Sequence, residues 1–246
     1  MRILAFDTAT RATTVALVDT DERSATGILA QARDDPAPGL RPRHTTHLMA
    51  LITEVLERGG GWDAVEGIAV GVGPGTFTGL RIGVATARAL AQARDLPLAG
   101  VSTLRSLAQA CTAAATAEAE FDAVVAVIDA RRGEVFAAAW ATAALAWPST
   151  DEPLLHPVAI APETLAEAGP ELGARRLTIG DGAIEFRAVL EASGATIPDR
   201  DSSVHQVDAV YHARLAAGLV RAGADVHPDY LRLPDAELSL RATQKR

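Results

Sequence analysis

Apolar runs of strand length alternate with amphipathic segments along the first part of the chain. The segment 44–58 repeats its apolar residues at helical spacing, the segment 77–94 is a run of helix formers, and an alanine-rich helix is expected to extend to about 119. The apolar runs lie at 3–6, 13–19, 25–30, 67–72 and 96–102, and the run at 13–19 alternates and is rich in β-branched residues. The predicted order is three strands, helix, strand, helix, strand, helix, which is typical of a ribonuclease H-like domain.

The second part of the chain shows a similar order without recognisable sequence identity to the first. Its predicted strands and helices lie at 123–129, 134–142, 154–160, 163–168, 175–182, 184–192 and 208–222. We therefore predict an α/β protein with two ribonuclease H-like lobes. The first lobe would comprise 1–105 with the helix near 208–222, the second would comprise 106–207, and 223–246 would form a C-terminal tail.

The composition indicates a soluble globular protein and narrows its partners. Of 246 residues, 23 are basic and 31 acidic, and the net charge of −8 argues against a direct grip on a nucleic-acid backbone. The single cysteine, Cys111, rules out an intramolecular disulfide and is expected to be a buried thiol. Asp7 comes too early for a secretory leader, and no long apolar stretch is present, so we expect a cytoplasmic protein without membrane contact.

A glycine-rich segment, GVGPGTFTG at 71–79, first suggests a phosphate-binding loop. A P-loop needs Lys and then Ser or Thr after its last glycine, but Leu80 and Arg81 stand there. A Rossmann turn would need a glycine in place of Thr76. Both phosphate motifs are therefore excluded. The small residues Gly79, Gly83 and Ala87 recur at i, i+4 and i+8, so this helix face could pack inside the protein or against another subunit.

Two aspartates occupy equivalent positions, because Asp7 and Asp129 each end the first strand of a predicted lobe. In actin-like ATPases this position supports a metal or phosphate between the lobes. The turns that follow, DTAT and DARRG, lack the paired small residues of a phosphate clamp. A small ATPase or kinase-like enzyme with a phosphate site at Asp7 and Asp129 stays open as an alternative. For His44 and His47, spaced i, i+3, a solvated or capping role is favoured over metal binding.

Five segments together resemble one known family. ILAFDTAT, GVGPGTFTGLRIGVATARALA, LPLAGVSTL, IDARRGEV and PDYLR match the TsaB (YeaZ) family in order and spacing over most of the chain. The resemblance implies two lobes of the actin-like, sugar kinase and Hsp70 ATPase superfamily (ASKHA). It also implies a non-catalytic scaffold or activating subunit for making tRNA N6-threonylcarbamoyladenosine. Such a subunit dimerises with TsaD, recruits the ATPase TsaE and forms a homodimer in isolation.

The resemblance further implies that catalysis lies outside this chain. TsaD carries two metal-binding histidines after the strand that matches LPLAGV, whereas Thr103 and Leu107 occupy those positions here. No metal or other cofactor is therefore expected in this chain. The resemblance places it in a peptidase M22-like family, but the old glycopeptidase label of that wider family fails for the same reason. ATP and metal would belong to the partner subunits, and tRNA would be met indirectly. Asp7, Thr8 and Asp129 would form a degenerate nucleotide site, and weak nucleotide binding is left open.

The resemblance also locates the partner contact on two helices of the first lobe. It leaves open whether Arg131 or Arg132 contacts tRNA or TsaE. We predict that the interface is lined by small and apolar residues, namely Leu48, Leu51, Ile52, Val55, Gly79, Gly83 and Ala87.

Overall fold

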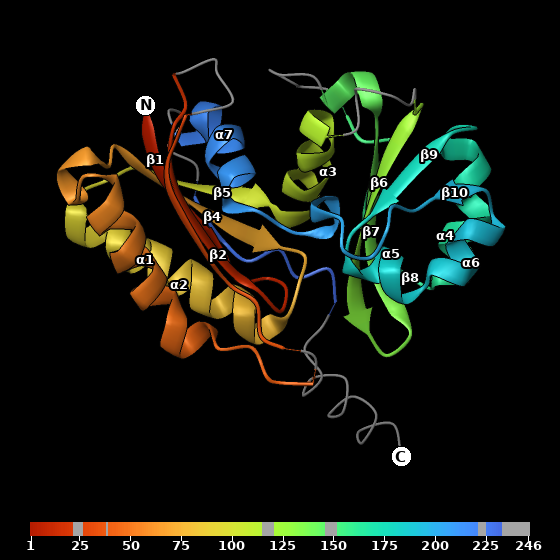
Figure 1. Ribbon diagram of the computed structural model, residues 1–246, viewed down its shortest axis with the longest axis horizontal. Coiled ribbons are helices and arrows are strands. Elements are labelled where there is room, and N and C mark those ends of the chain that lie inside the picture. Colours follow the sequence, from red (N-terminus) through yellow and green to blue (C-terminus); the bar gives the residue numbers. More distant parts are fainter. Residues whose placement is uncertain (22–26, 38, 115–120, 146–151, 221–224, 233–246) are drawn as a thin grey trace.

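The computed structural model contains two five-stranded sheets, each covered by helices on both faces (Figure 1). It describes residues 1–21, 27–37, 39–114, 121–145, 152–220 and 225–232. Among these residues, no helix combines the length and the apolar character that crossing a membrane requires.

The first sheet has the strand order β3-β2-β1-β4-β5. β1 pairs antiparallel with β2, β2 pairs antiparallel with β3, and β4 and β5 add parallel on the other side of β1. Helices α1 and α2 pack on one face of this sheet, and α7 packs on the opposite face. The bounds are β1 (Arg2–Asp7), β2 (Thr13–Asp19), β3 (Ile28–Asp34), α1 (His44–Gly59), β4 (Gly67–Gly73), α2 (Phe77–Arg94), β5 (Leu98–Ser102) and α7 (Ala209–Val220).

The second sheet repeats this arrangement with the order β10-β9-β6-β7-β8. Its first three strands in sequence are again antiparallel, and β9 and β10 add parallel beside β6. Helix α3 covers one face, and the shorter helices cover the other. The bounds are α3 (Thr103–Ala114), β6 (Ala123–Arg131), β7 (Glu134–Ala141), β8 (Leu155–Ile160), α4 (Pro162–Ala168), β9 (Arg176–Ile179), α5 (Asp181–Glu185), α6 (Arg187–Ala192) and β10 (Ala195–Thr196).

Both sheets therefore have the strand order of a ribonuclease H-like lobe, and the predicted fold class is confirmed. The sheets are built from residues on either side of α3, while α7 returns from the second lobe to the first. Short 3-10 turns join some elements: η1 (Trp62–Ala64), η2 (Thr142–Leu145), η3 (Gly169–Leu172) and η4 (Ser203–His205). The predicted lobe boundaries at 105 and 207 stay a prediction.

Three element predictions need correction. β3 is shifted toward the C-terminus relative to the predicted strand at 25–30, because this edge strand includes the polar residues Gln31 and Arg33 that break the apolar run. The predicted helix at 184–192 is divided at Phe186 into α5 and α6. The two-residue β10 was not predicted, because it is too short to show a pattern. The predicted helix ends at 115–119 and 221–222, and the tail from 233, lie outside the described residues.

Candidate functional site

The carboxylate of Asp7 lies at the end of β1, in the middle of the first sheet, and its residue is only 1% exposed. The Ala9 N–H donates a hydrogen bond to its Oδ1 (2.6 Å), and the Thr103 hydroxyl donates to Oδ2 (2.7 Å). His212 Nε2 lies 2.9 Å from the same Oδ2. The carboxylate is therefore enclosed by a backbone amide, a helix hydroxyl and an imidazole of the chain itself.

His212 connects Asp7 to a serine. Its Nδ1 lies 2.8 Å from Ser106 Oγ, so the residue types are those of a serine hydrolase triad, but the two ring nitrogens have exchanged partners, since in the triad Nδ1 faces the aspartate and Nε2 the serine. All three residues are at most 1% exposed, however, and Ser106 also donates to the Asp208 carbonyl oxygen (3.3 Å). A nucleophile must contact its substrate, so this buried hydroxyl does not support hydrolysis.

The surroundings of Asp7 favour its charged form. Burial by itself raises the pKa of this carboxyl, but the contacts with His212, the Ala9 N–H and the Thr103 hydroxyl outweigh burial and hold the pKa below its usual value. The surroundings of the neighbouring His44 favour its neutral form. Burial lowers the pKa of this imidazole, although the charge of Asp7 opposes that effect.

We expect Asp7→Asn to lower the free energy of unfolding at neutral pH by about 3 kcal/mol, since it removes the charge that the buried site is built to hold. A lowered native pKa gives stability that is present above the ordinary value of 3.8 and is lost as the pH falls through the native pKa. The difference between wild type and variant should therefore shrink below about pH 4. Urea unfolding of both proteins at several pH values measures this difference in the free energy of unfolding. A difference that does not change with pH would contradict this account.

Four glycines of the segment 71–83 leave room for the turn that follows β1. A Cβ on Gly71 would lie 1.7 Å from Asp7 Oδ2, and one on Gly79 would lie 1.9 Å from the Thr8 carbonyl oxygen. At Gly75 and Gly83 the same atom would meet the Ala9 carbonyl oxygen at 2.4 Å and Thr8 Oγ1 at 2.5 Å. No real Cβ fits at such distances. The space beside the glycine-rich segment is thus filled by residues 7–9 of the chain itself.

Two hydrogen bonds fix this turn against α2. Thr8 Oγ1 donates to the Gly79 carbonyl oxygen (2.7 Å), and the Thr76 N–H donates to the Ala9 carbonyl oxygen (2.8 Å). Of the two packing alternatives for the small-residue helix face, the structure therefore shows the internal one.

The predicted interface residues need correction at six of seven positions. Leu51 is partly buried and packs against the first lobe's core. The other six face the interior, because the apolar face of each helix is already used by the sheet; they are Leu48, Ile52, Val55, Gly79, Gly83 and Ala87. A partner that docks on α1 and α2 would meet their outer faces, and such docking stays a prediction.

Asp129, the counterpart of Asp7 in the second lobe, binds groups in its own lobe. Its Oδ1 accepts a hydrogen bond from the Arg131 N–H (2.7 Å), and the Arg131 guanidinium lies 2.9 Å from Oδ2. The Asp129 N–H donates to Asp181 Oδ1 (3.0 Å). Burial, with the nearby charge of Asp129, raises the pKa of Asp181. Asp7 and Asp129 have different partners among these contacts, and a nucleotide site between them stays a prediction.

The positions compared with the TsaD metal ligands are both inside the protein. Thr103 bonds to Asp7, and Leu107 is fully buried in the core of the second lobe. Within the described part of the chain, no three or more His, Cys, Asp or Glu side chains are grouped to hold a metal. His44 is buried, with its Nδ1 2.8 Å from Thr13 Oγ1, so the predicted solvated role is wrong for this residue.

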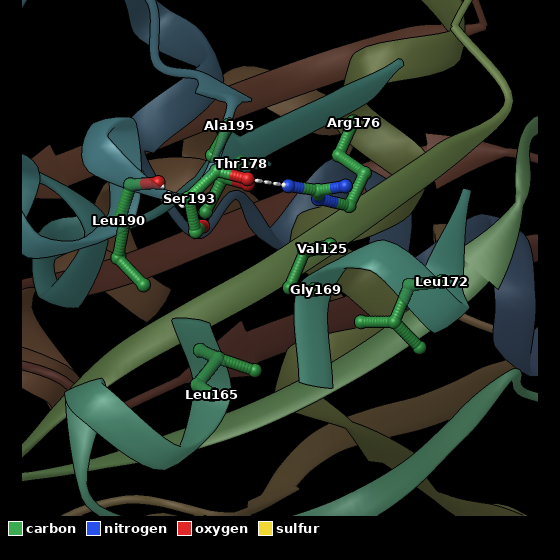
Figure 2. Close-up of a pocket in the computed structure, with 9 residues that line it drawn as sticks. All are labelled: Val125, Leu165, Gly169, Leu172, Arg176, Thr178, Leu190, Ser193 and Ala195. Carbon is green, nitrogen blue, oxygen red and sulfur yellow. Dashed lines mark hydrogen bonds between the residues drawn. The ribbon is translucent and has the colours of Figure 1, made fainter. Parts of the chain in front are cut away.

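A shallow pocket in the second lobe contains a buried arginine (Figure 2). Arg176 is 4% exposed and donates to the Gly173 carbonyl oxygen (2.6 Å) and to the Ser193 carbonyl oxygen. These carbonyls follow η3 and α6, where the helix dipoles place partial negative charge. Three leucines from different sides also line the pocket, namely Leu165, Leu172 and Leu190. We therefore assign Arg176 a structural role. Its guanidinium joins the C-terminal ends of η3 and α6 by hydrogen bonds to their carbonyl oxygens.

Sequence reasoning missed His212, Ser106 and Asp181. His212 lies on the apolar face of α7, and Ser106 lies in an alanine-rich helix, so neither stands out by type or spacing. Asp181 directly follows β9 and Gly180, a position that could have been noticed as another strand end in the second lobe.

Two sheets of identical strand order, joined through α3 and α7, define a two-lobed α/β protein of the ASKHA class. A family model described as "TsaD: tRNA N6-adenosine threonylcarbamoyltransferase" matches residues 38–186. The tRNA threonylcarbamoyladenosine biosynthesis protein TsaB of Escherichia coli is 33% identical over 205 residues, covering 81% of this chain and 79% of that protein. The chain belongs to the TsaB family.

Further relatives agree with this assignment. TsaB of Haemophilus influenzae is 39% identical over 137 residues, which cover 55% of this chain and 52%, about half, of that relative's length. The solved structure titled "YeaZ from Pseudomonas aeruginosa" superposes with a TM-score of 0.70 at 26% identity, covering 94% of this chain and 99% of that one. The resemblance to TsaB that the sequence motifs indicate is thereby confirmed.

Proposed function

We propose that this chain acts in the biosynthesis of tRNA threonylcarbamoyladenosine as a non-catalytic subunit of a complex with a TsaD-like transferase. The printed names of its relatives support the pathway. The observation that supports a non-catalytic role is the closed environment of Asp7, where Thr103 and His212 occupy the space around the carboxylate. A catalytic acid or metal ligand must instead reach substrate or metal.

The further partners in this proposal are a TsaE-like ATPase and, for the isolated chain, a second copy of itself. Contact with tRNA would pass through the complex, in agreement with the net charge of −8. ATP and metal would be bound by the partner subunits.

The outer faces of α1 and α2 are the surface that we propose for the TsaD-like subunit. The two helices lie side by side on the same face of the first sheet (Figure 1). Met49 is 48% exposed on α1, and α2 presents the exposed small residues Ala85 and Ala89, four positions apart. Small side chains permit a close approach of partner helices, and an exposed methionine adapts to an apolar partner.

Reconstitution of tRNA modification tests the proposed role. With threonylcarbamoyl-adenylate supplied as the donor, we expect the TsaD-like and TsaE-like proteins of the same organism to form threonylcarbamoyladenosine on tRNA only when this chain is added, because it would complete the transferase assembly. Mass spectrometry of digested tRNA measures the product. Equal modification without the chain, or turnover by the chain alone, would contradict the proposal.

Calorimetric titration with ATP and Mg²⁺ tests the ATPase alternative. We expect no micromolar binding by the isolated chain, because the turn around Thr8 fills the glycine-rich segment and Asp129 is paired with Arg131. Measured binding with hydrolysis would establish the enzyme that the alternative describes. An Asp129→Asn variant would then show whether that aspartate takes part.

A further inference from the structure

Helices α3 and α7 form the junction between the lobes. α3 follows the last strand of the first sheet but packs on the second sheet, through residues such as Leu104 and Leu107. α7 follows the second lobe in sequence but packs on the first sheet, through Val210 and Ala213. The two helices contact each other at the centre of the molecule (Figure 1). A movement of one lobe against the other must therefore displace α3 relative to α7 or to β1.

Buried polar side chains connect these three elements. Ser106 of α3 lies 2.8 Å from His212 of α7, and His212 lies 2.9 Å from Asp7 of β1. Thr103 of α3 donates directly to Asp7 (2.7 Å). All four side chains are at most 1% exposed. The contacts thus run from the helix of the second lobe to a strand and a helix of the first.

The free energy of such polar contacts rises more sharply with displacement than that of apolar packing does. A hydrogen bond weakens sharply when its distance or angle changes, and a buried polar group without a partner loses the hydration it had in water. Asp7 carries a charge with no solvent access, so separating it from Thr103 and His212 is especially unfavourable. In contrast, the ion pair between Arg232 and Glu134 of β7 is partly exposed, and pairs of this kind contribute little.

We propose that Asp7, Thr103, Ser106 and His212 form a polar clamp that fixes the position of one lobe relative to the other. In this clamp, the aspartate at the end of β1 is the point at which α3 and α7 meet the first sheet. The clamp is independent of the proposed function, since it concerns the conformation of this chain alone.

Distance measurement between spin labels in the two lobes tests the clamp. The label sites are Glu57→Cys on α1 and Ala188→Cys on α6, which are both exposed. The native Cys111 is 1% exposed, and burial raises the pKa of its thiol to about 12, so it should not react with the label. We expect one narrow distance distribution in the parent and a broader or shifted distribution in His212→Gln.

A matched control separates the clamp from ordinary stabilisation. Thr13→Val removes a buried hydroxyl that contacts a histidine, as Ser106 does, but its partner His44 lies in the same lobe. This variant should lose thermal stability while keeping the narrow distribution. If His212→Gln does not fold, Ser106→Ala deletes a single hydroxyl and gives the same readout. A folded clamp variant with the parental distance distribution, whatever its melting temperature, would overturn the proposal.

Discussion

Gly79→Ala should lower the free energy of unfolding by about 3 kcal/mol, although alanine is the better helix former. Its Cβ would lie 1.9 Å from the Thr8 carbonyl oxygen, which is a backbone atom held in the turn after β1. Relief requires that α2 or the turn moves, and this movement would stretch the hydrogen bonds that join Thr8 and Ala9 to α2. Chemical unfolding followed by circular dichroism measures the loss.

Gly218→Ala is the matched control for this substitution. Gly218 also lies in a helix, but a Cβ there would meet nothing within 4 Å, and the residue is exposed. This variant should gain about 1 kcal/mol from the higher helix propensity of alanine. A similar change in stability for both variants would mean that the close approach at Gly79 has no energetic consequence.

Ala85→Glu combined with Ala89→Glu should weaken binding to the TsaD-like subunit by about 100-fold or more, because docking would bury unpaired carboxylates. Both positions are exposed, so the melting temperature of the isolated chain should stay close to that of the parent. Co-purification and calorimetry with the TsaD-like subunit measure binding, and tRNA modification should fall in parallel.

Ala188→Glu on α6 controls for the added charge, because it places the same side chain on an exposed helix of the second lobe. It should bind like the parent. Unimpaired binding by the double variant would move the docking surface away from α2, while leaving the pathway assignment to be judged by the reconstitution.

The ribonuclease H-like fold of both lobes could be predicted because each lobe begins with three strands of clear apolar pattern, although the short β10 gave no signal. The same pattern misled the interface prediction. Apolar spacing at Leu48, Ile52 and Val55 reports which face of α1 is buried, and it does not distinguish burial against the sheet from burial against a partner. The exposed alanines of α2 carry no such periodic signal.

The site around Asp7 could be predicted only in part. The aspartate was found through its place at the end of a strand, but its partners Thr103 and His212 are far along the chain and have no motif around them. The role of Gly71 could not be predicted either. The sequence shows that this position has no side chain, but it does not show that the carboxylate of Asp7 lies where a Cβ would be.

The pairing of Asp7 with α7 has a consequence for the order of folding. Asp7 leaves the ribosome about two hundred residues before His212, which belongs to the last helix that the structure describes. Contacts between such distant segments form late, because a long loop must close before they gain anything. During synthesis the carboxylate of Asp7 therefore stays hydrated until the second lobe and then His212 have been made. The first sheet precedes the second lobe in sequence, but its covering helix α7 can be added only after the second lobe has been made.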